Sequence, residues 1–262
     1  MVQQRAWRVL GASGSAEIVL AADFPMSGRP EAGFADLATG LGPGFELWET
    51  VPASDGTNRP SAYVDRWLAE VRGTGFMVTA VLGFCVGGVY AAALADGVAR
   101  WQDRPKVVLF DPEKPTTTAL YWQFHRVVDR FAAVLSAQER ARAQRAAQVA
   151  SVEQPGFAAF AAVVAERFQE LAGVVFPRAG LEPARANELQ SAFLSFVDYL
   201  VVADGLDPDE GWASAITISS ADADDTVTAG ENLRFAAPHI GLLRDSAVAD
   251  AVAGLLNEVR AR

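Results

Sequence analysis

The chain contains a single cysteine, and it stands between glycines in the stretch "GFCVGG", residues 83–88. A continuous apolar run (76–84) precedes Cys85, and an Ala-rich segment of helical character follows it. A strand, Gly-x-Cys-x-Gly and a helix form the layout of a nucleophile elbow with cysteine in the nucleophile position. The alternative is a buried thiol beside helix-packing glycines, since free cysteine is commonly buried. The position directly after a fully apolar strand favours the elbow.

A thiol nucleophile needs a base, and the chain has two histidines. His239 lies in "FAAPHIGLLRD", after the last expected strand and before the C-terminal amphipathic segment. The chain order nucleophile, acid, histidine is that of α/β hydrolases. His125 lies in the helical stretch "ALYWQFHRVVDRF" and is interpreted as a partly exposed helix residue. His239 is therefore the expected base.

The expected acid is Asp111, which ends the buried strand "KVVLFD" (106–111). The carboxyl ends of parallel strands are where the sites of such sheets lie. The competing acids are Asp222, Asp224 and Asp225 in "SSADADDTV", an acidic turn after the next strand. Such turns are usually only solvated, so Asp111 is favoured, and the alternative stays open.

These residues must be positioned by strands that alternate with helices. Short apolar strands are expected at 17–24, 45–51, 76–84, 106–111 and 214–220. Helical segments are expected at 34–41, 60–73 and 245–259. Such alternation predicts an α/β fold with a mostly parallel central sheet. From about 116 to 205 only helical periodicity is found, so we expect one domain, 1–262, with a helical insertion.

Composition excludes several classes of function. The net charge is −10, which argues against non-specific binding to nucleic acid. No apolar run reaches the roughly 18 residues that a membrane-spanning helix needs, and the start lacks the apolar core of a secretory signal. One cysteine fits a reducing compartment, so a cytoplasmic location is expected. Two histidines without clustered ligands predict no metal site.

From about residue 17 to the end, the chain resembles the thioesterase domains of polyketide and non-ribosomal peptide synthetases, within the α/β-hydrolase superfamily. The resemblance rests on "GFCVGG", "VVLFDPEKP", the helical segment and "APHIGLLRD". It implies a helical lid at about 116–205 and a triad of Cys85, His239 and Asp111. It also implies an oxyanion hole made by the amides of Val86 and Met26. Most members carry serine as nucleophile, and "ADFPMSGRP" stands here in place of the usual His-Gly-rich signature.

The resemblance further implies an acyl thioester on the phosphopantetheine arm of an acyl or peptidyl carrier protein, with no cofactor of the enzyme's own. A thioester on Cys85 stays activated, so hydrolysis, cyclisation and acyl transfer are all compatible with the triad. Trp122 and Phe193 are expected to face the acyl cavity. Two alternatives stay open: a small-ester or lactone hydrolase like dienelactone hydrolase, and a catalytically inactive α/β-hydrolase scaffold.

Overall fold

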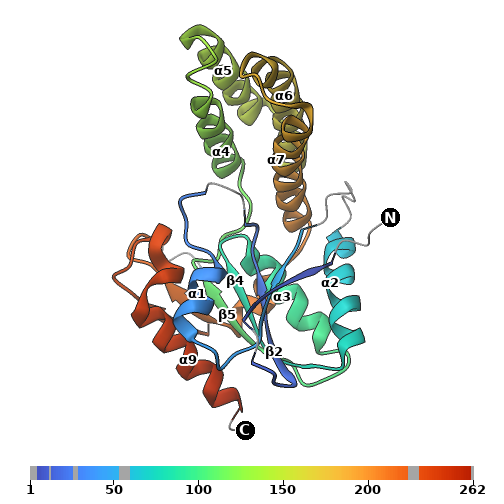
Figure 1. Cartoon of the computed structure of the whole chain (residues 1–262), viewed down its shortest axis with the longest axis vertical. Coiled ribbons are helices and arrows are strands. Elements are labelled where there is room, and N and C mark those ends of the chain that lie inside the picture. The colour runs from blue at the N-terminus through green and yellow to red at the C-terminus, as the bar shows by residue number, and fades with distance from the viewer. Residues whose placement is uncertain (1–4, 12, 26–28, 53–59, 224–229, 261–262) are drawn as a thin grey trace. The chain divides into compact units, whose positions relative to one another are not determined.

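The computed structural model describes residues 5–11, 13–25, 29–52, 60–223 and 230–260. The chain forms two compact units (Figure 1). The first unit comprises Met1–Ala53, Arg59–Lys114 and Gly205–Arg262, and the second comprises Ser54–Asn58 and Pro115–Asp204. The sheet and the predicted catalytic residues belong to the first unit, and the predicted helical insertion corresponds to the second.

The first unit is built on a seven-stranded sheet of order β1-β3-β2-β4-β5-β6-β7. Its strands are β1 (Trp7–Gly11), β2 (Glu17–Ala22), β3 (Leu47–Thr50), β4 (Met77–Phe84), β5 (Lys106–Phe110), β6 (Ile216–Ser219) and β7 (Glu231–Arg234). Among the described strands, β1 alone is antiparallel to its neighbour, and the other pairs are parallel. The five predicted strands all form, and the mostly parallel α/β sheet is confirmed.

Side chains of β4 alternate between the two faces of the sheet, as a pleated strand requires. On one face, Leu82 and Phe84 join a core with α1 (Phe34–Leu41), the 3₁₀ helix η1 (His239–Arg244) and α9 (Ser246–Arg260). On the other, Gly83 meets α3 (Gly87–Val98), which packs on α2 (Pro60–Thr74) and on the short helix α8 (Asp209–Ala213). Figure 1 shows these two helix layers on either side of the strands.

The two edge strands, β1 and β7, are absent from the sequence prediction. β7 has the sequence "ENLR", in which three of the four residues are exposed. It is held by parallel pairing with β6, and the Ser219 hydroxyl hydrogen-bonds Asn232 Oδ1 at 2.8 Å. An edge strand needs backbone partners on one side only, so it can form without the apolar run on which the prediction relied.

The second unit contains α4 (Thr117–Arg130), α5 (Ala137–Glu153), α6 (Phe157–Arg178) and α7 (Pro183–Asp204). Its described residues contain no strand, which confirms the helical reading of this segment. Side-chain caps start α4 and α5: Thr116 accepts from the Ala119 amide, and Ser136 forms a capping box with Glu139. Gly156, with φ at 110°, separates α5 from α6.

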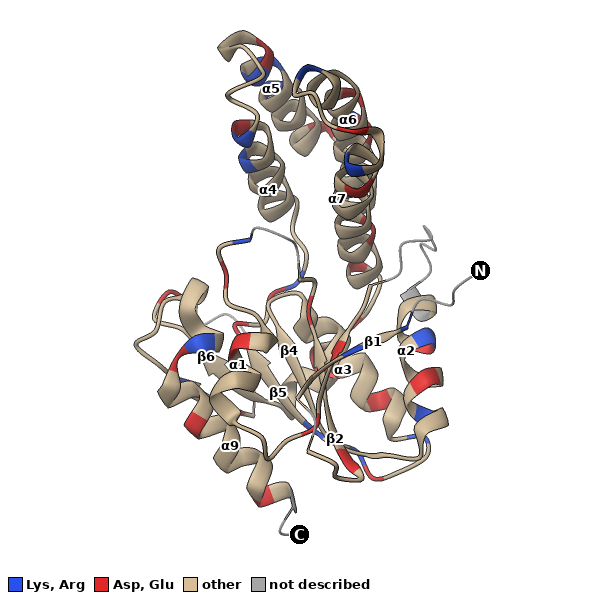
Figure 2. Ribbon diagram, viewed as in Figure 1, with Lys and Arg blue, Asp and Glu red and all other residues tan. Residues whose placement is uncertain are grey.

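Acidic residues outnumber basic ones in the chain. Asp and Glu together number 32 against 22 Lys and Arg, and both signs are interspersed along the helices of each unit (Figure 2). None of the described helices has the length and apolar composition needed to cross a bilayer.

Candidate active site

Cys85 lies at a sharp turn between β4 and α3. Its φ is 51°, and Asp111 has φ at 41°; no other non-glycine residue in the described ranges has a positive φ. This left-handed conformation is costly for residues with a Cβ and is concentrated at functional sites. The Cys85 amide donates to the Phe110 carbonyl at 2.9 Å, and the Asp111 amide donates to that of Ile218 at 3.1 Å. Each strained residue is thus held by the backbone of the next strand.

The glycines that flank Cys85 are required by close backbone approach. A Cβ on Gly87 would lie 1.9 Å from the Ala22 carbonyl oxygen, at the end of β2. A Cβ on Gly83 would lie 2.6 Å from the Cα of Gly88. Neither methyl can be accommodated without moving the backbone. Both glycines of the Gly-x-Cys-x-Gly stretch are therefore needed for the backbone to pass this close to the turn.

His239 and Asp111 form a hydrogen-bonded pair at the same sheet edge as Cys85. Phe84 and Phe110 are register partners on β4 and β5, so Cys85 and Asp111 leave neighbouring strands at the same level. His239 Nδ1 lies 2.7 Å from Asp111 Oδ2, and its ring stacks on Phe84 with centroids 5.0 Å apart. Because a carboxylate only accepts, Nδ1 carries the hydrogen and Nε2 is left to accept a proton.

The charges of this pair stabilise each other. Burial opposes ionisation of Asp111, but hydrogen bonds from His239 and Ser220 outweigh it and lower the pKa of Asp111. The hydrogen bond to Asp111 raises the pKa of His239, against the effect of burial. The pair therefore favours the imidazolium that forms when His239 takes a proton.

The thiol of Cys85 is directed to a carboxylate that the sequence analysis did not single out. Cys85 Sγ donates to Glu113 Oε2 at 3.8 Å, and none of the hydrogen bonds within the described chain joins it to His239. Burial and the charge of Glu113 raise the pKa of Cys85, while the Val86 amide acts in the opposite direction. The resting group is therefore the thiol. Glu113 follows the predicted acid by two residues, and its place in the same strand-end loop was the available signal.

A second unpredicted feature is an ion pair at the end of β2. Asp23 accepts two hydrogen bonds from the Arg29 guanidinium, one of them 2.9 Å long from Nη1 to Oδ1. The guanidinium carbon of Arg29 also lies 5.6 Å from the centroid of the Phe84 ring. Both the Arg29 guanidinium and the His239 ring thus contact Phe84, the residue before the thiol.

The competing acids are placed differently or lie outside the described residues. Asp222 Oδ2 accepts from the backbone amide of His239 at 3.0 Å, so it contacts the main chain of the base and not its ring. Asp224, Asp225 and the expected oxyanion donor Met26 all fall outside the described residues. Among the described acids, Asp111 is the one that hydrogen-bonds the imidazole.

Trp122, Phe193 and His125 lie in the second unit. Phe193 is buried, with its ring centroid 4.0 Å from that of Phe168, so it packs between α7 and α6. Trp122 is 52% exposed, and its ring lies 5.3 Å from that of His125. His125 Nδ1 lies 3.2 Å from Asp129 on the same helix. The contact of Trp122 and Phe193 with an acyl chain stays a prediction.

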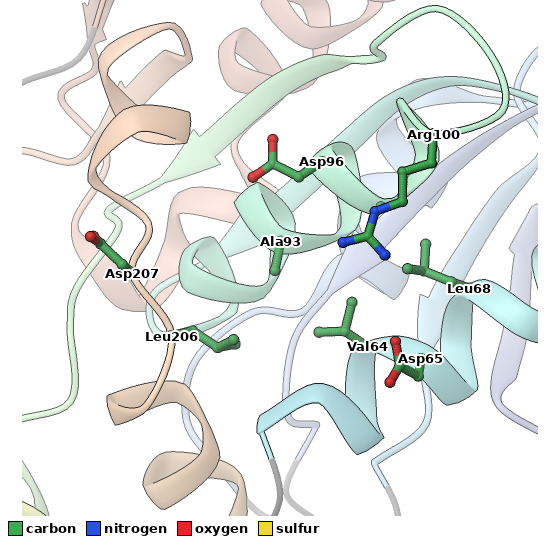
Figure 3. Close-up of a pocket in the computed structure, with 9 residues that line it drawn as sticks. Val64, Asp65, Leu68, Ala93, Asp96, Arg100, Leu206 and Asp207 are labelled. Atoms are coloured by element: carbon green, nitrogen blue, oxygen red, sulfur yellow. The ribbon is translucent and has the colours of Figure 1, made fainter.

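A separate hollow of about 390 Å³ lies along α2 and α3 (Figure 3). Apolar side chains of Val64, Leu68 and Leu206 line it together with Asp65 and Arg100. Neither Cys85 nor His239 borders it, so it is distinct from the strand-end site. In the described part of the chain, no three His, Cys, Asp or Glu side chains are grouped to hold a metal ion.

The sheet order, the turn at Cys85 and the acid–histidine arrangement define an α/β-hydrolase fold. Among solved structures, the Vlm2 thioesterase domain with genetically encoded 2,3-diaminopropionic acid, bound with a dodecadepsipeptide, is similar. It is 17% identical at a TM-score of 0.52, with 97% of this chain and 96% of that chain covered. A mutant of DBJA matches at the same TM-score of 0.52 with 17% identity, covering 98% of this chain and 95% of that one.

No family model matches the sequence, and no curated protein matches it. At these identities the structural likeness establishes the fold.

Proposed function

We propose that this protein is an acyl-thioesterase that takes an acyl or peptidyl chain from a carrier-protein phosphopantetheine thioester onto Cys85. The observation that carries the proposal is the left-handed Cys85 at the strand-to-helix turn, next to the hydrogen-bonded His239–Asp111 pair. A buried structural cysteine has no need of this strained conformation, whereas a nucleophile above the sheet edge does.

In the proposed acylation step, His239 Nε2 takes the thiol proton and Cys85 Sγ attacks the thioester carbonyl. The negative charge that develops on the carbonyl oxygen is stabilised by the Val86 amide, at the start of α3. The pantetheine sulfur leaves with the electron pair of the C–S bond and receives the proton from the imidazolium. Asp111 orients His239 and stabilises its charged form throughout.

In deacylation, His239 activates a second nucleophile, which attacks the Cys85 thioester, and the cysteine sulfur leaves as the thiol. Exchange of one thioester for another is close to thermoneutral, so the acyl group on Cys85 keeps its reactivity. The second nucleophile can be water, a hydroxyl or an amine, giving hydrolysis, ester formation or amide formation.

The proposal extends to the partner and to the second unit. The Vlm2 thioesterase domain, which shares the fold, is described as bound with a dodecadepsipeptide. This supports a peptide-like acyl chain as the group that Cys85 accepts in this protein. We infer that an acyl or peptidyl carrier protein delivers the chain and that the helices of about 116–205 act as a lid. In this proposal Met26 supplies the second oxyanion amide, and Trp122 and Phe193 face the acyl chain.

The test is intact-mass detection of an acyl adduct after incubation with a panel of acyl-pantetheine thioesters. The wild-type protein should gain one acyl mass that maps to Cys85, and Cys85→Ala should gain none. Cys85→Ser serves as a control that keeps the turn and the base. Full turnover by Cys85→Ala would contradict the proposal. Turnover of small esters and lactones without any reaction of acyl-pantetheines would favour the small-ester hydrolase instead.

A further inference from the structure

Glu113 is tethered beside the nucleophile by two contacts. Its backbone amide donates to the Cys85 carbonyl oxygen at 3.3 Å, and its carboxylate Oε2 lies 3.8 Å from Cys85 Sγ. The side chain is exposed. The backbone contact holds the main chain of Glu113 beside Cys85, so the carboxylate stays within reach of the sulfur when the side-chain hydrogen bond is broken.

The site is negatively charged on the elements that surround the thiol and the imidazole. The carboxylates whose charge acts on Cys85 or His239 are Asp23, Glu31, Asp111 and Glu113. Two cations of the adjoining segments are already paired: Arg29 binds Asp23, and Lys114 lies 2.6 Å from Asp209. A site with excess negative charge concentrates cationic groups.

Acylation of Cys85 removes the hydrogen-bond donor of Glu113. The free thiol donates its hydrogen to the carboxylate, but a thioester sulfur has no hydrogen to donate. In the acyl-enzyme, the Glu113 carboxylate therefore stands beside the reacting carbon without its former partner. A protonated amine offers it three donors and a positive charge, whereas water and alcohols offer a neutral O–H.

We propose that Glu113 binds the ammonium form of an amine and thereby selects a primary amine as the second nucleophile. This inference rests on the proposed function, because it requires an acyl group on Cys85. It makes the product an amide, formed with an external amine or with an amino group of the acyl chain itself.

The proton count of this reaction needs two acceptors, which are solvent and His239. The ammonium held at Glu113 loses one proton to solvent, and the neutral nitrogen forms the C–N bond as the carbonyl electron pair moves to oxygen. His239 Nε2 takes a second proton from nitrogen. The C–S bond then breaks, and the Cys85 sulfur leaves with its electron pair and recovers that proton from the imidazolium. Attack by water needs only His239, since water loses a single proton before sulfur leaves.

The experiment measures how the acyl-enzyme partitions between nucleophiles of equal size. Protein acylated from an acyl-pantetheine thioester is mixed with n-butylamine or with n-butanol, and amide, ester and acid are quantified by mass spectrometry. Glu113→Gln keeps the size and hydrogen-bonding capacity of the side chain and removes its charge. Glu258→Gln, whose carboxylate lies 3.5 Å from Lys106 on another part of the first unit, is the matched control.

We expect Glu113→Gln to lower the amide-to-acid ratio about fivefold, the effect of one exposed ion pair, with no decrease in acyl-enzyme formation. The ester-to-acid ratio should not fall, and Glu258→Gln should behave as wild type. An unchanged amide-to-acid ratio in Glu113→Gln overturns this inference alone. So does an equal loss of hydrolysis and aminolysis, which would make Glu113 a general base for any nucleophile. Absence of an adduct on the wild-type protein overturns the proposed function as well.

Discussion

Replacement of Gly87 by alanine tests the turn that positions the nucleophile. The added Cβ would lie 1.9 Å from the carbonyl oxygen of Ala22 and 2.7 Å from its carbonyl carbon. Favourable contacts between such atoms lie near 3.5 Å or beyond, so the end of β2 and the start of α3 would have to separate by more than ~1 Å. Both obstructing atoms are backbone, so no side-chain rotation relieves the overlap.

The cost can be placed at the upper end of that measured for overpacked cores, about 3 kcal/mol. For a domain of this size, each kcal/mol lowers Tm by roughly 2–4 °C, so Gly87→Ala should melt about 6–12 °C below wild type. The displacement also moves Cys85 relative to His239. Misplacement of reacting groups by about 1 Å can reduce the rate about 10²-fold, so acylation should fall even well below the Tm.

The assay combines thermal unfolding followed by circular dichroism with the rate of acyl-enzyme formation at 20 °C below the Tm of each variant. Gly254→Ala is the matched control in the same unit: it lies within α9, and its Cβ would meet nothing within 4 Å. That variant should be as stable as wild type or up to about 1 kcal/mol more stable, since alanine favours a helix over glycine. A Gly87→Ala protein with wild-type Tm and acylation rate would refute the elbow geometry.

Two further predictions concern ionisable groups. Asp111 raises the pKa of His239 above its ordinary value of 6.5, so the neutral imidazole predominates only at higher pH. The acylation rate should therefore fall on acidification, with the midpoint of this acid limb above pH 6.5. Asp111→Asn should lower the acylation rate by about 10³-fold or more and move this limb to lower pH. Asp222→Asn should leave the limb in place. A larger effect of Asp222→Asn than of Asp111→Asn would assign the role of the acid to Asp222. Burial raises the pKa of Glu49 from its ordinary 4.5 to about 7 in the folded protein. As pH rises through this window, the unfolded chain releases the Glu49 proton before the folded protein does. The free energy of unfolding therefore falls, by roughly 3 kcal/mol in all. Urea unfolding of Glu49→Gln should lack this loss, and a difference from wild type that stays constant between pH 4 and pH 8 would contradict it.

Prediction from the sequence succeeded where burial leaves a periodic signal. Apart from Thr79, the strand β4 is apolar because it is covered on both faces, and its pattern is unambiguous. The edge strand β7 lacks that signal, because it is held in place by backbone pairing with β6 and not by burial of apolar side chains. Helical periodicity likewise placed Phe193 on a helix, but its partner Phe168 comes from another helix, and sequence spacing holds no information about that contact.

For the site, the sequence predicted which residues end neighbouring strands but not where their side chains point. Cys85 and Asp111 follow register partners, so their proximity follows from parallel pairing. The direction of the thiol depends on the rotamer at Cys85 and on the loop after β5, which brings Glu113 to the sulfur. That loop carries no periodic signal, and this is why the second carboxylate was missed.

The two left-handed residues together argue for a site more strongly than either does alone. Aspartate tolerates positive φ better than most residues, so Asp111 by itself could be an ordinary strand-end turn. Cysteine has no such tolerance, and glycine at position 85 would relieve the strain. The surrounding backbone prevents relaxation: Gly87 abuts Ala22, and a Cβ on Gly88 would lie 3.0 Å from Pro112, the residue after Asp111. The packing that keeps Cys85 strained thus also connects its turn to that of Asp111. In the proposed function, the chemistry of the thiol is the reason for this strained side chain on the carboxyl edge of the sheet.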